Sequence, residues 1–177
     1  LEKAVFVGLS MGGAVAMQFA LKYPQMVEKL VLANTAARFA NKLGGSLYSL
    51  IKRIFVMSCL PRKYGANMVS RFVFPKASQE DFRKEFFREI MMSDKGAYFD
   101  AVRSIIKHDV REQIGNIATP TLVIGGSHDM VTPNFLQNFI HERIKGSKFV
   151  IIEGAGHVSS VDSAAEFNKE MLDFLGK

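Results

Sequence analysis

The sequence contains one cysteine and no long apolar run, and these absences exclude several classes of protein. Cys59 is the one cysteine among 177 residues, so an internal disulfide and a metal site built from several cysteines are both excluded. No apolar stretch approaches the roughly 20 residues that a transmembrane helix needs. The first residues also lack the basic segment, apolar run and cleavage site of a signal peptide. We therefore expect a folded domain in a reducing compartment, the cytoplasm.

Acidic residues are scarce in the middle of the chain, although the two ends are balanced. The formal net charge is +6, and residues 36–112 contain fifteen Lys/Arg against eight Asp/Glu, a balance of +7. The rest of the chain contains eight against nine, a balance of −1. The excess indicates either a solvated helical surface or attraction to anionic substrates or a membrane surface. Nucleic acid is not an expected partner, because the basic residues form no compact run and no nucleic-acid motif is present.

Short apolar segments alternate with amphipathic segments near both ends of the chain. Buried parallel strands are predicted at 3–8, 29–33, 121–125 and 148–153, where β-branched, leucine and aromatic residues cluster. Helices are predicted at 10–23, 134–144 and 163–175. Strands that alternate with helices favour an α/β fold with one parallel sheet.

The segment between the second and third predicted strands interrupts this alternation. Apolar residues recur there at helical spacing, at Leu47, Leu50, Ile51, Ile54 and Phe55. Further helical patterns cover 80–92 and 98–107. We therefore predict an α/β core made of residues 1–35 and 119–177, with a helical insertion at 36–118.

The run Gly8-Leu9-Ser10-Met11-Gly12 joins the first predicted strand to the first predicted helix. Gly-x-Ser-x-Gly in that context is the sequence form of a nucleophile elbow, a tight turn that exposes the serine hydroxyl. We expect Gly8 and Gly12 to leave space where a Cβ would collide with neighbouring backbone.

Two further residues could activate Ser10. A nucleophilic serine needs a base, and the base needs a group that orients it. Asp129 and His157 lie in the loops after the third and fourth predicted strands, at the sheet edge where open α/β sheets place their sites. The sequence thus predicts a Ser10–His157–Asp129 triad. His108 and His141 lie in predicted helical segments and are expected to be solvated, whereas His128 and Asp162 lie close to the triad in sequence and are expected to be structural.

These motifs resemble those of the α/β-hydrolases, especially the lidded esterases, enol-lactonases and carbon–carbon bond hydrolases. The matching segments are Gly-Leu-Ser-Met-Gly-Gly, Pro-Thr-Leu-Val-Ile-Gly-Gly-Ser-His-Asp-Met-Val-Thr-Pro and Gly-Ala-Gly-His. The resemblance implies a partial α/β-hydrolase fold whose insertion at 36–118 is a helical lid. It also implies that the Met11 N–H is an oxyanion donor, and that neither a metal nor an organic cofactor is needed.

The resemblance further implies strands that normally precede the elbow strand. Without them, the strand at 3–8 is expected at an open sheet edge, which is a template for pairing with another chain. The expected partner is an N-terminal half supplied in trans or a second copy that pairs through residues 3–8. The loop that usually carries the second oxyanion donor would come with that half.

The function predicted from these residues is a serine hydrolase acting on a carboxylic ester, lactone or related acyl substrate. Fifteen Phe and nine Met favour an apolar substrate. The alternative is a non-catalytic, hydrolase-like module for interaction or assembly. A narrower hypothesis is that the basic helical segment at 47–60 contacts an anionic membrane surface or a lipid substrate.

Overall fold

The computed structural model describes residues 2–39 and 61–176. The chain divides into two compact units. The first comprises Leu1–Arg38 and His108–Lys177, and the second comprises Phe39–Lys107. The helix predicted from the apolar residues at 47–55, the basic segment at 47–60 and Cys59 lie outside the described residues.

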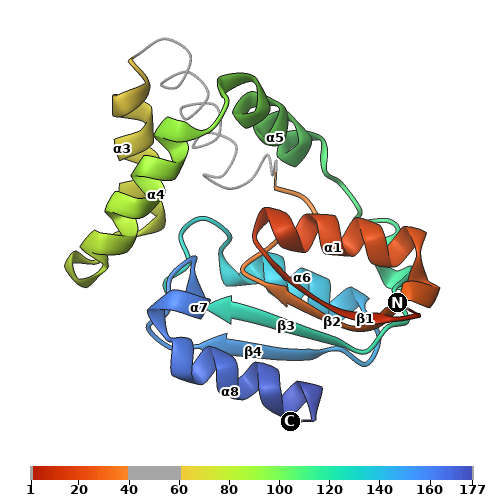
Figure 1. Cartoon of the computed structure of the whole chain (residues 1–177). Helices are drawn as coiled ribbons and strands as arrows, with labels where there is room; N and C mark the ends of the chain where they lie inside the picture. The colour runs from red at the N-terminus through yellow and green to blue at the C-terminus, as the bar shows by residue number, and fades with distance from the viewer. Residues whose placement is uncertain (1, 40–60, 177) are drawn as a thin grey trace. The chain divides into compact units, whose positions relative to one another are not determined.

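A four-stranded parallel sheet forms the centre of the first unit. Its strands are β1 (Ala4–Leu9), β2 (Val27–Ala33), β3 (Thr121–Gly126) and β4 (Lys148–Ile152), in the spatial order β1-β2-β3-β4. The parallel sheet predicted from the sequence is confirmed, and β1 lies at one edge of it (Figure 1).

Alternating side chains of the strands build one apolar core on each face of this sheet. Leu30 and Leu32 of β2 belong to the core on one face, and Val31 and Ala33 to the core on the other. All four are fully buried. This two-sided burial explains why the central strand is a continuous apolar run rather than an alternating one.

Helices cover both faces (Figure 1). Helices α1 (Met11–Lys22) and α6 (Asn134–Arg143) pack on one face, where Met17 and Ile140 are fully buried. Helix α8 (Ala164–Leu175) packs on the other through Phe167. Three short helical segments complete the unit: η1 (Pro24–Met26), η3 (Ile114–Asn116) and α7 (Ser159–Asp162).

Residues 108–118 belong to the first unit, whereas the insertion predicted from the sequence includes them. Val110, Ile114 and Ile117 belong to the core cluster beneath α1 and α6, and the Val110 N–H donates to the Ala37 carbonyl at 2.9 Å. The segment has little regular structure, so its apolar residues carry no periodic pattern that reveals this packing.

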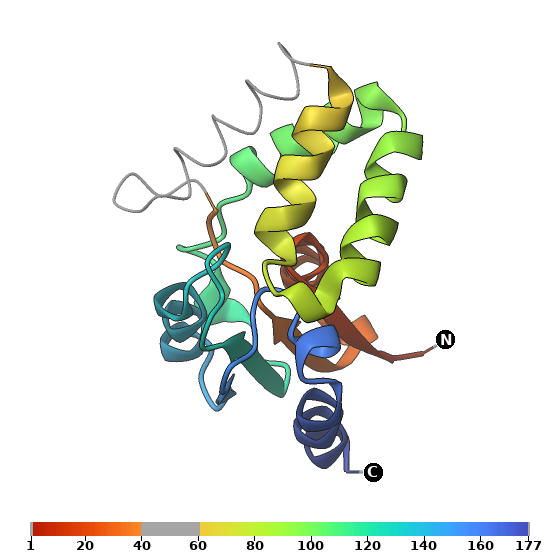
Figure 2. The same ribbon diagram turned by 90° about the vertical axis from the view of Figure 1, so that its left-hand side faces the viewer.

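The second unit contains α3 (Arg62–Val73), η2 (Ala77–Gln79), α4 (Glu80–Met92) and α5 (Lys95–Lys107). Figure 2 shows α3 and α4 side by side, and Ala66, Val69 and Ile90 form their buried apolar cluster. Helix α4 has the predicted bounds. Helix α5 begins before the predicted residue 98, because the Asp94 carboxylate accepts the Ala97 N–H at 2.8 Å in its first turn.

Helix α3 was not predicted from the sequence, and small residues occupy much of its buried face, namely Gly65, Ala66 and Ser70. Within the described ranges, no helix combines the length and the apolar character needed to cross a membrane.

Candidate active site

Ser10 occupies a sharp turn between β1 and α1. Its backbone angles are φ 52° and ψ −116°, a combination that residues with a side chain rarely adopt. Two contacts with β2 and the loop after it hold the turn. The Ser10 N–H donates to the Ala33 carbonyl at 2.9 Å, and the Thr35 hydroxyl donates to the Ser10 carbonyl at 2.7 Å. Strained backbone held in this way is typical of functional sites.

The glycines of the turn differ in what they require. A Cβ on Gly8 would lie 2.5 Å from the Gly12 carbonyl oxygen, so the close approach predicted at Gly8 is confirmed. The close approach predicted at Gly12 is wrong, because a Cβ there would meet nothing within 4 Å. The second tight position is Gly13, where a Cβ would lie 2.7 Å from the Thr35 side chain. Gly12 is exposed and Gly13 is buried, so Gly13 is the residue that packs α1 against Thr35 in the loop after β2.

The structure brings Ser10, Asp129 and His157 together. His157 Nε2 lies 2.9 Å from Ser10 Oγ, and His157 Nδ1 lies 3.1 Å from both carboxylate oxygens of Asp129. The three residues follow β1, β3 and β4. Because these strands are parallel, their carboxyl ends all lie at the same end of the sheet. A carboxylate accepts hydrogen bonds, so the proton of neutral His157 is on Nδ1 and Nε2 is free to accept from the serine hydroxyl.

The Asp129 carboxylate is buried and accepts several hydrogen bonds besides that of His157. Oδ1 accepts the N–H groups of Val131 at 2.8 Å and Thr132 at 2.9 Å, and Oδ2 accepts the Thr132 hydroxyl at 2.6 Å. Burial raises the pKa of Asp129, but the hydrogen bond and charge of His157 and the bonds from Thr132 outweigh it. The net result is a pKa below the ordinary value, so Asp129 is ionised at neutral pH.

Asn34 joins the loop after β3, which carries Asp129 and is called the acid loop below, to the loop after β4, which carries His157 and is called the histidine loop. Its side-chain N–H₂ donates to Asp129 Oδ2 at 3.0 Å and to the Gly156 carbonyl at 3.2 Å. The Ser159 hydroxyl donates to the amide oxygen of Asn34, which fixes the orientation of the amide. Asn34 is fully buried and has a positive φ of 46°, a conformation that asparagine tolerates better than most residues.

Asn34 and Thr132 were not predicted from the sequence. A signal for Asn34 was present, since a polar residue directly follows β2 at the same sheet edge as the three predicted residues. Asp162, expected to be structural, accepts the Gly156 N–H through Oδ2 at 2.6 Å and so holds the histidine loop. The backbone N–H of His128 donates to the Ala155 carbonyl at 2.9 Å, which ties the acid loop to the same segment.

His108 was expected to be solvated, and that expectation is wrong. It follows the end of α5 and is 7% exposed. Burial lowers the pKa of His108 below its ordinary value, while a backbone hydrogen bond with Ala36 and the charge of Asp109 offset part of that change. His141, also expected to be solvated, is half-buried on α6, and its Nδ1 lies 2.8 Å from the Ser147 hydroxyl.

Met11 is the first residue of α1, so its N–H has no acceptor within the helix. It directly follows Ser10, at the positive end of the helix dipole. Among the described residues, no group of three or more His, Cys, Asp or Glu side chains could hold a metal ion.

The chain matches the family with the alpha/beta hydrolase fold over residues 1–164. It is 29% identical over 197 residues to a proline iminopeptidase of Saccharolobus solfataricus, covering 97% of this chain and 63% of that protein. It is 27% identical over 177 residues to 3-oxoadipate enol-lactonase 1 of Acinetobacter baylyi, covering 99% and 65%.

A solved structure also matches this chain. The crystal structure of the enol-lactonase from Burkholderia xenovorans matches with a TM-score of 0.87 and 26% identity, covering 99% of this chain and 66% of that one. The chain thus spans 63% to 65% of the length of the two curated relatives described above. The matched region contains all four strands and the loops that carry Ser10, Asp129 and His157. The chain therefore belongs to the α/β-hydrolase fold family.

Proposed function

We propose that this chain carries the catalytic centre of a serine hydrolase that cleaves carboxylic esters, lactones or related acyl compounds. The observation that supports the proposal most directly is the continuous path from Ser10 Oγ through the His157 ring to the Asp129 carboxylate, with contacts of 2.9 Å and 3.1 Å. Both contacts are within the hydrogen-bonding reach that an activated nucleophile needs.

In the proposed reaction, Ser10 Oγ attacks the acyl carbonyl while His157 Nε2 takes the hydroxyl proton. The ionised Asp129 fixes the ring tautomer and stabilises the imidazolium that forms. The C–O bond to the leaving group then breaks, and His157 returns its proton to the departing oxygen. Water, deprotonated by His157, next cleaves the acyl–Ser10 ester. The carboxylic acid leaves and the serine hydroxyl is restored.

The Met11 N–H supplies one donor to the oxyanion that develops during each attack. Its place beside the nucleophile at the start of α1 supports this role, because the N–H is unpaired within the helix and the helix dipole favours negative charge there. A second donor would come from a partner segment, as the family resemblance implies.

Strand β1 supports the proposal of such a partner. β1 pairs with β2 along one side and lies at the sheet edge, and Val5 and Val7 are 39% and 51% exposed. A further strand along this edge would take up its open backbone groups. We propose that either an N-terminal segment or a second copy provides it.

The relatives support the substrate class. Those described above are named as an iminopeptidase and an enol-lactonase, and both names denote enzymes that cleave a bond at an acyl carbon. The apolar acyl substrate predicted from the composition belongs to the same proposal.

A fluorophosphonate probe tests the assignment, because it reacts with an activated serine. We expect the chain to be labelled at Ser10 and the S10A variant to remain unlabelled. Ser104→Ala is the matched control, since Ser104 is an exposed serine on α5 and its loss should leave labelling unchanged. A folded chain that is not labelled would refute the proposal and favour the non-catalytic interaction module.

A further inference from the structure

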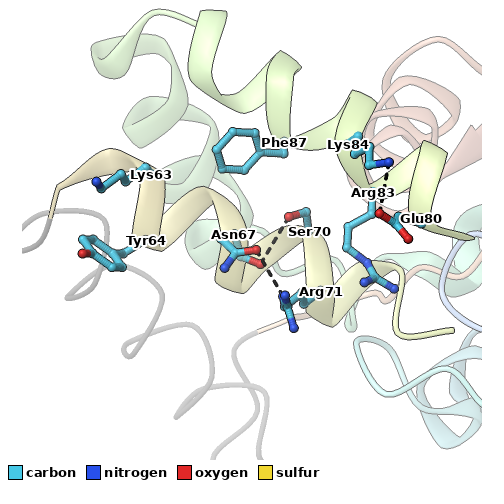
Figure 3. A pocket seen from close by; sticks show the side chains of 9 residues that line it. All are labelled: Lys63, Tyr64, Asn67, Ser70, Arg71, Glu80, Arg83, Lys84 and Phe87. Carbon is cyan, nitrogen blue, oxygen red and sulfur yellow. Dashed lines mark hydrogen bonds and ion pairs between the residues drawn. The ribbon is translucent and has the colours of Figure 1, made fainter. Parts of the chain in front are cut away.

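A cavity of about 460 Å³ lies between α3 and α4, wholly within the second unit (Figure 3). Its volume lies in the range of pockets that take small molecules, about 300–1,000 Å³. The lining side chains come from one face of each helix. They include Lys63, Tyr64 and Arg71 of α3 and Arg83, Lys84 and Phe87 of α4.

The charges around this cavity do not cancel. Among the described residues that line it, four are cationic and Glu80 is the one carboxylate. Glu80 forms an ion pair with Lys84, whose Nζ lies 3.0 Å from its Oε1. The hydrogen bond from Lys84 lowers the pKa of Glu80. Among the described residues, no carboxylate forms an ion pair with Lys63, Arg71 or Arg83. The cavity therefore has a net positive charge.

Neutral acceptors hold the two guanidinium groups in place. Arg83 donates to the Phe74 carbonyl at 3.0 Å and to the Lys76 carbonyl at 2.8 Å. Arg71 donates through Nε to the Asn67 amide oxygen at 3.2 Å. These bonds restrict each side chain without neutralising its charge, and each guanidinium keeps N–H groups that those bonds do not use. A guanidinium held in this way is well suited to a carboxylate or a phosphate.

Aromatic rings supply the apolar part of the lining. Phe87 packs against the apolar cluster of α3 and α4 and is half-buried, so one side of its ring contacts the protein core. The Tyr64 ring, 55% exposed, lies beside Lys63, whose Nζ is 5.3 Å from the ring centroid of Tyr64. The cavity therefore combines positive charge with an aromatic surface.

We propose that this cavity binds a small organic anion. A carboxylate or phosphate monoester group contacts Arg71 and Arg83, and an apolar moiety attached to it packs on Phe87. Part of the excess positive charge of residues 36–112 would then serve to bind this anion. It is independent of the function proposed for Ser10, since every lining residue belongs to the second unit.

Calorimetric titration of the whole chain with four probes tests the ligand class. Octanoate, octyl phosphate, octanol and octylammonium share the apolar chain and differ in the head group. We expect at least one of the two anions to bind at least tenfold more tightly than octanol and octylammonium, and added salt to weaken that binding. The tighter of the two anions identifies the head group. Equal affinity for octanol and both anions would overturn the proposal.

Arg71→Gln tests the location. Arg71 is exposed and donates one hydrogen bond to Asn67 on its own helix, so the variant is expected to fold, as a thermal melt would show. We expect its affinity for the tighter anion to fall about tenfold, the loss expected for one charge-assisted contact. The matched control is Arg103→Gln, an exposed position on α5 outside the cavity lining. Unchanged affinity in Arg71→Gln, or an equal loss in Arg103→Gln, would refute the site.

Discussion

The side-chain amide of Asn34 donates a hydrogen bond to the Asp129 carboxylate, with 3.0 Å between Nδ2 and Oδ2. The two residues follow neighbouring strands, β2 and β3. The same amide donates to the Gly156 carbonyl at 3.2 Å, one residue before His157. Asn34 thus acts on the proposed base through both the carboxylate that orients it and the loop that carries it, which makes Asn34 a positioning residue.

Asn34→Gly removes this amide while keeping a residue that accepts the positive φ of 46°. We expect the labelling rate at Ser10 to fall by about tenfold or more, because the loss of a hydrogen bond to a buried charge costs about 1.5–3 kcal/mol. The measurement is the pseudo-first-order rate of fluorophosphonate labelling.

Asn34→Asp tests the electrostatic part of the same relationship. A second carboxylate beside Asp129 raises the pKa of the pair by like-charge repulsion, so the acid limb of the rate profile should move to higher pH. A labelling rate and pH profile equal to those of the unaltered chain in both Asn34 variants would exclude the positioning role.

Asp129→Asn should preserve the packing of the loop and disable the site. An amide that donates to Nδ1 of His157 stabilises the wrong tautomer, and in other serine triads this change lowers turnover by about 10⁴. Hydrolysis of p-nitrophenyl esters measures the effect. Asp100→Asn on α5 is the matched control, since that side chain is exposed. Equal activity in the two variants would contradict the role of Asp129.

The positions of the strands and of the three predicted site residues followed from the sequence for physical reasons. Buried parallel strands need continuous apolar runs, and the carboxyl ends of such strands lie at one edge of the sheet. Ser10, Asp129 and His157 each follow such a run, so their convergence could be predicted without knowing any distance.

The remaining parts of the site depend on contacts that have no local pattern. Asn34 donates hydrogen bonds to Asp129 and Gly156, which lie 95 and 122 positions away in the sequence. No spacing rule predicts contacts over such separations. His108 was misjudged because it lies beyond the end of α5, in the segment 108–118 that belongs to the first unit, where it is buried. Gly12 and Gly13 are adjacent, and which of them faces Thr35 depends on where the first turn of α1 begins.

A pair of glycine substitutions tests the packing of the elbow. Gly13→Ala places a Cβ 2.7 Å from the Thr35 side chain, and we expect the free energy of unfolding to fall by about 1–3 kcal/mol. Gly12→Ala meets nothing within 4 Å and removes a flexible residue from a helix, so it should raise the free energy of unfolding by up to about 1 kcal/mol. Urea denaturation compares the two variants. If Gly12→Ala were the less stable variant, Gly12 rather than Gly13 would be the residue that faces Thr35.

His108 should make the stability of the chain depend on pH. Burial lowers the pKa of His108 in the folded state, whereas the unfolded chain has the ordinary value of about 6.5. Between these two values the unfolded state binds more protons, so the free energy of unfolding rises with pH. The contribution of His108 is therefore complete above about pH 6.5 and is lost as the pH falls toward the folded-state pKa.

His108→Gln removes this titration, and the curve of unfolding free energy against pH should flatten below about pH 6.5. The comparison uses slopes rather than absolute stabilities, so a general loss of packing in the variant does not obscure the result. Asp109→Asn provides a second test of the sign. Its charge raises the pKa of His108, and its removal should lower that pKa further and steepen the dependence. Parallel curves for all three proteins would show that His108 does not titrate differently in the folded and unfolded states.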